Sequence, residues 1–131
     1  DPAIHVYWTG EEVCSAEIGP AHVARMAQVL GRQIALWDNY PVNDYASSAG
    51  RLLLAPYAKR EAGLSTELTG ILSNPMNQEV PSRVAVTGVL AFAWNDKGYD
   101  ADRTWHYAAR NLAGLAKVLT PETYPVPESG E

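Results

Sequence analysis

Residues 33–45 read Gln-Ile-Ala-Leu-Trp-Asp-Asn-Tyr-Pro-Val-Asn-Asp-Tyr, "QIALWDNYPVNDY". The apolar run 33–37 predicts a buried β-strand. The polar stretch after it holds four side chains that hydrogen-bond well, Asp38, Asn39, Asn43 and Asp44. A surface turn needs Asn, Asp or Pro, but it does not need the Trp and two Tyr that stand among them. This mixture predicts a surface that stacks on a flat group and hydrogen-bonds a partner rich in hydroxyl groups.

Two similar units flank this stretch. The apolar runs 3–10 and 68–74 predict two further strands, and polar clusters follow them as "WTGEEV" (8–13) and "SNPMNQ" (73–78). Helices are predicted over 19–31, 81–94 and 100–119. Pro20 suits the first position of the first helix, and Gly31 suits its C-terminal cap. The apolar segment 50–58 fits either a short helix or an extended chain.

The helical patterns also predict which side chains share a face. In the first helix Val23 and Leu30 fall on one face, and in the second helix Val84 and the flanking Trp94 share one stripe.

The order strand, helix, strand, loop, strand, helix predicts an α/β fold with a parallel sheet. Each predicted strand is apolar on both of its faces, so helices are expected to cover both faces of the sheet. In such folds the carboxyl ends of the strands carry the functional site. The three polar clusters are therefore expected to meet in one pocket.

Composition excludes several functions. The chain has 131 residues, 47% of them hydrophobic, a net charge of −5 and a pI near 5.1, which suit one domain and argue against a nucleic-acid partner. It has no apolar stretch of roughly 18 residues, so no membrane partner is expected. Cys14 is the single cysteine, which gives secretion no support. A soluble protein is expected, with the compartment open and the cytoplasm favoured. The start "DPAIHVYW", without Met, looks like the middle of a protein.

Four motifs, in this order and near this spacing, resemble the signatures of glycoside hydrolase family 84: "WTGEEV" (8–13), "LWDNYPVNDY" (36–45), "LLLAPY" (52–57) and "ILSNPMNQ" (71–78). That family comprises the retaining β-N-acetylglucosaminidases, among them O-GlcNAcases and bacterial hyaluronidase-like enzymes. The stretch "WNDKGYDADRTW" (94–105) resembles the passage from the family's last barrel helix into a helical region.

The resemblance implies a (β/α)₈ barrel, of which this chain would supply the C-terminal three βα units, strands six to eight. Residues 1–96 would then be the C-terminal part of the catalytic domain, 97–119 a helix leading into a following helical region, and 120–131 a linker or disordered tail. The remainder of the barrel is an implied partner.

The resemblance also implies a reaction, the removal of terminal β-linked N-acetylglucosamine from a glycan or glycoprotein. The acetamido oxygen of the sugar attacks the anomeric carbon and forms an oxazoline, while an adjacent Asp pair polarises the acetamido group and transfers the proton. The sequence contains no Asp-Asp, so the pair is expected upstream and this segment alone is expected to be inactive. The only adjacent carboxylates, Glu11 and Glu12, are expected in a solvated turn.

The implied contribution of this segment is the sugar-binding wall. Asp44 matches the residue that accepts hydrogen bonds from the 4- and 6-hydroxyls, and a carboxylate suits such donors. Asn39 and Asn74 match asparagines that line the same subsite, where an amide both donates and accepts. Trp37 matches the aromatic wall of the acetamido pocket, and Val13 matches an apolar contact there. Core packing is the alternative for Trp37 and Val13.

Asp38 is expected to lie behind this wall and orient it, with plain turn chemistry as the alternative. Asp44 and Asn74 could likewise only shape turns. No cofactor and no metal are expected, because the oxygen donors between residues 38 and 44 lack the spacing of a calcium loop.

Two other functions compete with the glycosidase. A carbohydrate-binding module or pseudoenzyme would keep the wall without the catalytic acids. A self-contained three-stranded interaction domain would leave the edge of the first strand unpaired. The sequence leaves open whether the substrate is O-linked N-acetylglucosamine on protein or N-acetylglucosamine at the ends of glycans.

Overall fold

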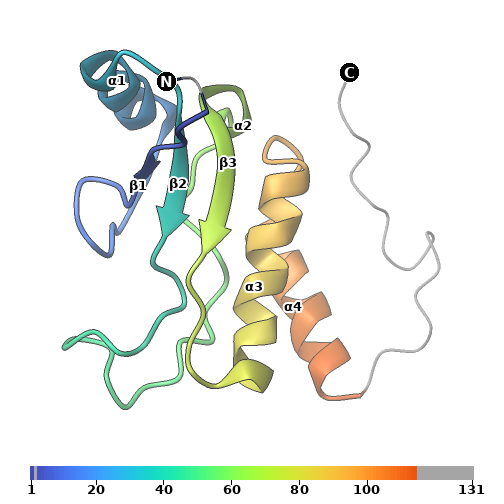
Figure 1. The fold of residues 1–131 in the computed structure, drawn as a ribbon. Coiled ribbons are helices and arrows are strands. Elements are labelled where there is room, and N and C mark those ends of the chain that lie inside the picture. The colour runs from blue at the N-terminus through green and yellow to red at the C-terminus, as the bar shows by residue number, and fades with distance from the viewer. Residues whose placement is uncertain (2, 115–131) are drawn as a thin grey trace.

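A computed structural model describes residues 1 and 3–114. Its parallel three-stranded sheet has the order β1-β2-β3, with β1 at Tyr7–Trp8, β2 at Ile34–Asp38 and β3 at Leu68–Ser73. The helices are α1 at Pro20–Leu30, α2 at Leu64–Glu67, α3 at Glu79–Trp94 and α4 at Ala101–Leu112. Figure 1 shows α3 beside the sheet and α4 packed against α3. The predicted parallel α/β arrangement is confirmed.

The β1–α1–β2 unit forms where the sequence predicts it. Pro20 occupies the start of α1, where its missing N–H costs no helical hydrogen bond. Gly31 ends the helix with φ 66°, a left-handed conformation in which glycine avoids a Cβ clash. The first strand is shorter than the predicted run 3–10, because only Tyr7 and Trp8 pair with residues of β2.

The core lies between the sheet and α3. Ile34 and Leu36 of β2 pack there with Tyr57 and with Val89 and Phe92 of α3. Residues 51–58 are neither helix nor strand, which settles the choice left open for this segment. Gly88 explains how close α3 comes to this segment, because a Cβ there would lie 2.8 Å from the Cβ of Tyr57.

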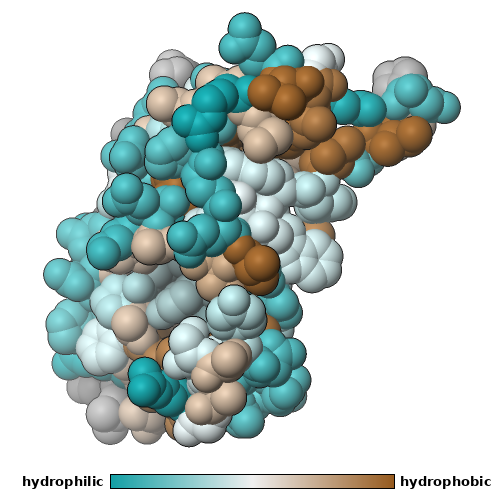
Figure 2. Space-filling model, turned by 90° about the vertical axis from the view of Figure 1, so that its left-hand side faces the viewer, coloured by the Kyte–Doolittle hydropathy of each residue, from teal (hydrophilic) through white to brown (hydrophobic). Residues whose placement is uncertain are grey.

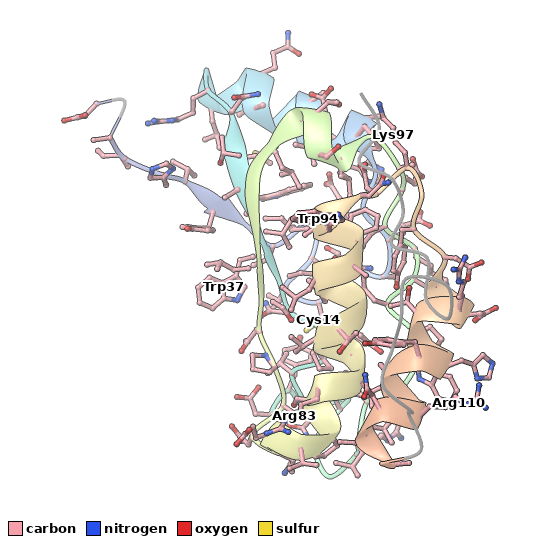
Figure 3. All side chains as sticks on the ribbon, turned by 90° about the vertical axis from the view of Figure 1, so that its right-hand side faces the viewer. Cys14, Trp37, Arg83, Trp94, Lys97 and Arg110 are labelled. Atoms are coloured by element: carbon pink, nitrogen blue, oxygen red, sulfur yellow. The ribbon has the colours of Figure 1, made fainter. Side chains whose placement is uncertain are left out.

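The expectation that helices cover both faces of the sheet is wrong for the described residues. Side chains alternate along a strand, so Leu36 points into the core while Trp37 points to the other face. Tyr7, Trp37 and Leu72 of the three strands are all exposed, and Trp37 pairs in register with Leu72. Figure 3 shows Trp37 directed away from α3. The face opposite α3 is thus apolar but uncovered.

Two residues of the predicted apolar helix faces lie at the surface. Leu30 is exposed near the end of α1, and Trp94 at the end of α3 is 69% exposed. Figure 2 shows apolar surface gathered toward the top of the molecule, the end at which α1 lies in Figure 1. The helical stripes therefore predicted apolar faces correctly, but they did not predict which faces the described residues cover.

The short helix α2 was not predicted, since four residues are too few to show the helical periodicity of apolar side chains. It forms through a tertiary contact, because the buried Asp96 accepts hydrogen bonds from the backbone N–H groups of Gly63 and Ser65 at 2.7 and 3.0 Å. In α4, the Asp100 carboxylate caps the N-terminus by accepting from the N–H of Arg103. Residues 115–119 of the predicted helix and the tail 120–131 lie outside the described residues. None of the described helices has the length and apolarity needed to cross a membrane.

Candidate functional site

The amide of Asn39 joins the ends of all three strands. Its Oδ1 accepts hydrogen bonds from Nε1 of Trp37 and from Nδ2 of Asn74, each at 3.0 Å. Its Nδ2 donates to the carbonyl oxygen of Val13 at 2.7 Å. Val13 follows β1, Asn39 follows β2 and Asn74 follows β3. Four residues predicted to line one site thus form a connected group, the strand-end network of Val13, Trp37, Asn39 and Asn74.

The chemistry of the partners fixes the orientation of these two amides. An indole N–H can only donate, so the Asn39 atom facing Trp37 is the oxygen, and a carbonyl can only accept, so the atom facing Val13 is the nitrogen. Asn74 must then present its nitrogen to the Asn39 oxygen. Two protein donors therefore occupy the Asn39 oxygen, which leaves one N–H of Asn39 for a ligand. Asn74 keeps its Oδ1 and one N–H.

Trp37 and Val13 are exposed, at 40% and 56%, so neither side chain belongs to the core that the described residues form. The Trp37 ring lies edge-on to Tyr7, with centroids 6.2 Å apart. Both rings belong to the uncovered face of the sheet. An indole held by a hydrogen bond and an aromatic neighbour offers a fixed apolar surface beside the polar amides.

Asp44 lies farther along the loop after β2, and its side chain is exposed. The buried Asn43 anchors this loop, because its Nδ2 donates to the Arg51 carbonyl at 2.9 Å and to Oε1 of Gln78 at 2.8 Å. Among the described residues no hydrogen bond joins Asp44 to Asn39 or Asn74. Burial, followed by the charges of Asp38 and Asp44, raises the pKa of the Cys14 thiol, so the field of Asp44 reaches the residue next to Val13.

Asp38 lies beneath the strand-end network. Its carboxylate accepts from Nε and Nη2 of Arg60 at 2.8 and 2.7 Å and from the hydroxyl of Tyr57 at 2.7 Å. Burial alone would lower the pKa of Arg60, but the hydrogen bonds and charge of Asp38 raise it above its ordinary value. Burial and then Asp38 raise the pKa of Tyr57. Tyr57 therefore stays a neutral hydroxyl, and Arg60 stays charged in its ion pair with Asp38.

Arg60 was not predicted, because a basic residue in a loop gives no signal, although Tyr57 ends the motif "LLLAPY". A cavity of about 470 Å³ opens beside this cluster, lined by Cys14, Ser15, Asn39, Tyr40, Tyr57 and Arg60 among others. The Tyr40 hydroxyl donates to the Ala55 carbonyl at 2.6 Å, so this ring packs under the loop.

The adjacent carboxylates Glu11 and Glu12 lie in an exposed turn, as expected, and Glu11 forms a surface ion pair with Arg25. Across the described part of the chain, the structure brings together no group of three His, Cys, Asp or Glu side chains suited to a metal ion.

A parallel sheet whose strand ends gather amides, an indole and carboxylates defines an α/β protein with a candidate site at the carboxyl ends of the strands. The family model of β-N-acetylglucosaminidase matches residues 1–123. The chain therefore belongs to the β-N-acetylglucosaminidases, glycoside hydrolases of family 84.

Relatives agree with this assignment. Protein O-GlcNAcase from Rattus norvegicus and from Mus musculus is in each case 36% identical over 85 residues, which are 65% of this chain and 9% of the relative. A mutant O-GlcNAc hydrolase of Thermobaculum terrenum superimposes with a TM-score of 0.82 at 35% identity, covering 86% of this chain and 24% of that one. For the structure of CpGH84B the TM-score is 0.77 at 31% identity, covering 85% and 20%. The chain thus spans a small part of the proteins that it matches.

Proposed function

We propose that this chain is the sugar-binding wall of a glycosidase that removes terminal β-linked N-acetylglucosamine by a retaining, substrate-assisted mechanism. The observation that carries the proposal is the strand-end network, in which the Asn39 amide links Val13, Trp37 and Asn74 from three strand ends. A binding site for a monosaccharide needs an apolar surface beside polar groups that hydrogen-bond the sugar's hydroxyls. The network provides both, because the Trp37 ring lies beside the amides of Asn39 and Asn74.

We further propose that residues 1–96 form the last three βα units of a (β/α)₈ barrel. Three observations support this placement. The strands are parallel and neighbours in chain order, as in a barrel. Their uncovered face carries Tyr7, Trp37 and Leu72, which the interior of a closed barrel would bury. The two solved structures are roughly four times as long as this chain, which covers 24% and 20% of them.

In this assignment each wall residue has one task. Trp37 and Val13 shape the pocket for the acetamido methyl group, and Asn74 offers an acceptor and a donor to the sugar. Asp44 accepts hydrogen bonds from the hydroxyls at the far side of the ring, where its charge strengthens them. Because the wall holds the acetamido group against the anomeric carbon, it contributes the alignment that an intramolecular attack needs.

The proton-transfer groups belong to an adjacent Asp pair outside this chain, whose sequence contains no Asp-Asp. One carboxylate would polarise the acetamido group, and its neighbour would protonate the leaving oxygen and later activate water. The chain on its own is therefore expected to be inactive. The same observation supports the second candidate, a carbohydrate-binding module or pseudoenzyme that keeps the wall and lacks the acids.

The full-length protein separates the two candidates. We expect it to hydrolyse 4-nitrophenyl N-acetyl-β-glucosaminide, to release the β-anomer first by NMR, and to slow when fluorine atoms on the acyl group withdraw electrons from the attacking oxygen. Binding of N-acetylglucosamine without turnover would support the binding module. Release of the α-anomer would contradict the retaining mechanism.

The proposed substrate is a glycan or glycoprotein bearing N-acetylglucosamine, since the relatives from rat and mouse are named for O-linked N-acetylglucosamine. Competition between an O-linked glycopeptide and a chitobiose-type glycan, at equal concentrations and with the full-length protein, would rank the two substrate classes.

A further inference from the structure

All five N–H groups of Arg60 have a hydrogen-bond acceptor, and the proposed chemistry gives this residue no task. Its side chain is 7% exposed and that of its partner Asp38 is 2% exposed. A guanidinium has five N–H groups, and here each has an acceptor. Two bind the Asp38 carboxylate, and the other three point at the carbonyl oxygens of Ser15, Ala16 and Ala58 at 3.2 to 3.4 Å.

These bonds hold together segments that are far apart in the sequence. Ser15 and Ala16 belong to the loop between β1 and α1, Asp38 ends β2, and Ala58 lies in the long segment before α2. The backbone carbonyl of Asp38 also accepts from the N–H of Asn74 at 2.9 Å, which adds the end of β3. Arg60 thus links the loop after β1 to the end of β2, and the backbone of Asp38 links that end to the end of β3.

The loop between β1 and α1 is held from both sides. Nδ2 of Asn39 binds the Val13 carbonyl, and two residues later Nη2 of Arg60 binds the Ser15 carbonyl. Asn39 and Arg60 therefore both hold the loop that carries Val13, at positions two residues apart. A fork-shaped, bidentate pair fixes such a geometry better than a flexible ammonium group would.

Stability alone is a weak reason for this cluster, because a buried ion pair is commonly no better than apolar side chains of similar volume. We propose that Arg60, acting through Asp38 and the loop that carries Val13, is a positioning residue that sets the depth of the acyl pocket and so the discrimination between N-acetyl and longer N-acyl sugars. This inference rests on the proposed function, since it assumes that Val13 and Trp37 face the acyl group.

The test compares two substrates with the full-length protein, 4-nitrophenyl glucosaminides that carry an N-acetyl or an N-butanoyl group. Arg60→Lys keeps the positive charge but loses the bidentate geometry toward Asp38. The loop that carries Val13 should therefore be held less firmly. We expect the ratio of kcat/KM for N-acetyl over N-butanoyl to fall about fivefold or more, since one methylene in an apolar pocket is worth about 10–200-fold in selectivity. Tyr57→Phe removes only the hydroxyl bond to Asp38 and should shift the ratio in the same direction by less.

Asp96→Asn is the matched control. Asp96 is also a buried carboxylate with several hydrogen bonds, but it holds Gly63 and Ser65 before β3, at the end of the strand away from the site. It should lower the melting temperature and leave the acyl ratio unchanged. An unchanged ratio in folded Arg60→Lys, or an equal change in Asp96→Asn, overturns the proposal. If Arg60→Lys does not fold, Tyr57→Phe decides by the same criterion. Failure of the wild type to cleave either substrate would instead refute the proposed function.

Discussion

The Oδ1 atom of Asn39 accepts a hydrogen bond from Nδ2 of Asn74 across 3.0 Å, from the end of one strand to the end of the next. This bond makes the two amides one unit with unequal roles. The oxygen of Asn39 accepts bonds from both Trp37 and Asn74, whereas the oxygen and one N–H of Asn74 remain for a ligand. In this geometry only Asn74 keeps both an acceptor and a donor, so the prediction that an amide donates to and accepts from the sugar rests on Asn74.

The first prediction follows from this inequality. If Asn39 acts mainly by holding Asn74 and Val13, then Asn39→Ala and Asn74→Ala should each lower kcat/KM, and the double variant should be little worse than the poorer single variant. Coupled neighbours depart from additivity by about 0.5–3 kcal/mol. Steady-state kinetics of the full-length protein on a chromogenic N-acetylglucosaminide measure the coupling.

Asn43→Ala supplies the control for that cycle, because Asn43 bonds to Arg51 and Gln78 and lies outside the strand-end network. The free-energy effects of Asn43→Ala and Asn74→Ala on kcat/KM should therefore be additive. Strict additivity between Asn39 and Asn74 would show that each amide acts on the substrate independently.

Asp44 is predicted to be the strongest single contributor to sugar binding. Asp44→Ala should reduce transition-state binding by several kcal/mol, because a buried hydrogen bond to a charged group contributes about 1.5–3 kcal/mol. Substrates that lack the 4- or 6-hydroxyl should lose less in this variant than in the wild type. Asp102→Ala, an exposed carboxylate in the first turn of α4, serves as the control. A change in kcat/KM below twofold for Asp44→Ala would show that this residue is misassigned.

Gly10 is predicted to be indispensable to the loop that carries Val13. Its φ is 99°, and a Cβ would lie 2.0 Å from Oγ of Ser15, whose hydroxyl donates to the Thr9 and Glu12 carbonyls. Gly10→Ala should cost about 1–3 kcal/mol in unfolding free energy from backbone strain and steric overlap. It should also raise KM, since Val13 moves with the loop. Thermal unfolding and kinetics measure both effects.

Gly31→Ala is the comparison for Gly10. Gly31 also has a positive φ, 66°, but an added Cβ would meet nothing within 4 Å. This variant should lose about 1 kcal/mol of stability with no change in KM, because it caps α1 away from the site. A similar rise in KM for both variants would mean that general destabilisation, and not the loop, governs binding.

The hydrogen bonds of Asp96 predict that the folded protein loses unfolding free energy in acid. Burial alone would raise the pKa of Asp96, but hydrogen bonds from Ser65, Gly63 and Lys97 lower it below the ordinary value of 3.8. A carboxyl with a lowered folded pKa stabilises the fold above its unfolded pKa, and this contribution is lost as the pH falls through the folded pKa. Wild type should thus exceed Asp96→Asn in unfolding free energy at neutral pH. Urea unfolding at a series of pH values should show the difference shrinking below pH 3.8, and a constant difference would contradict the assignment.

Local patterns predicted much of the fold. The strand at 33–37, the helix between Pro20 and Gly31 and the helix before Trp94 all appear within about two residues of their predicted bounds, because caps and periodicity are properties of the chain itself. The convergence of polar side chains at the strand ends was predictable for the same reason, since parallel strands place their carboxyl ends at one edge.

Other features depended on tertiary contacts. Helix α2 exists because Asp96 reaches it across the fold, and Arg60 matters because two remote carbonyls, those of Ser15 and Ala16, and one remote carboxylate surround it. Local sequence contains no signal for either. The division of labour between Asn39 and Asn74 also appears only when their donors and acceptors are paired in space.

The sequence by itself determined the parallel α/β order, the polar strand ends and, through four spaced motifs, the family to which the chain belongs. Only the tertiary structure decided which face of the sheet is covered, how Arg60 and Asp38 fix the loop of Val13, and which amide remains open to a ligand. The physical reason is that periodicity and capping act within about one turn or strand, whereas hydrogen-bond satisfaction and burial are settled between segments that meet only after folding.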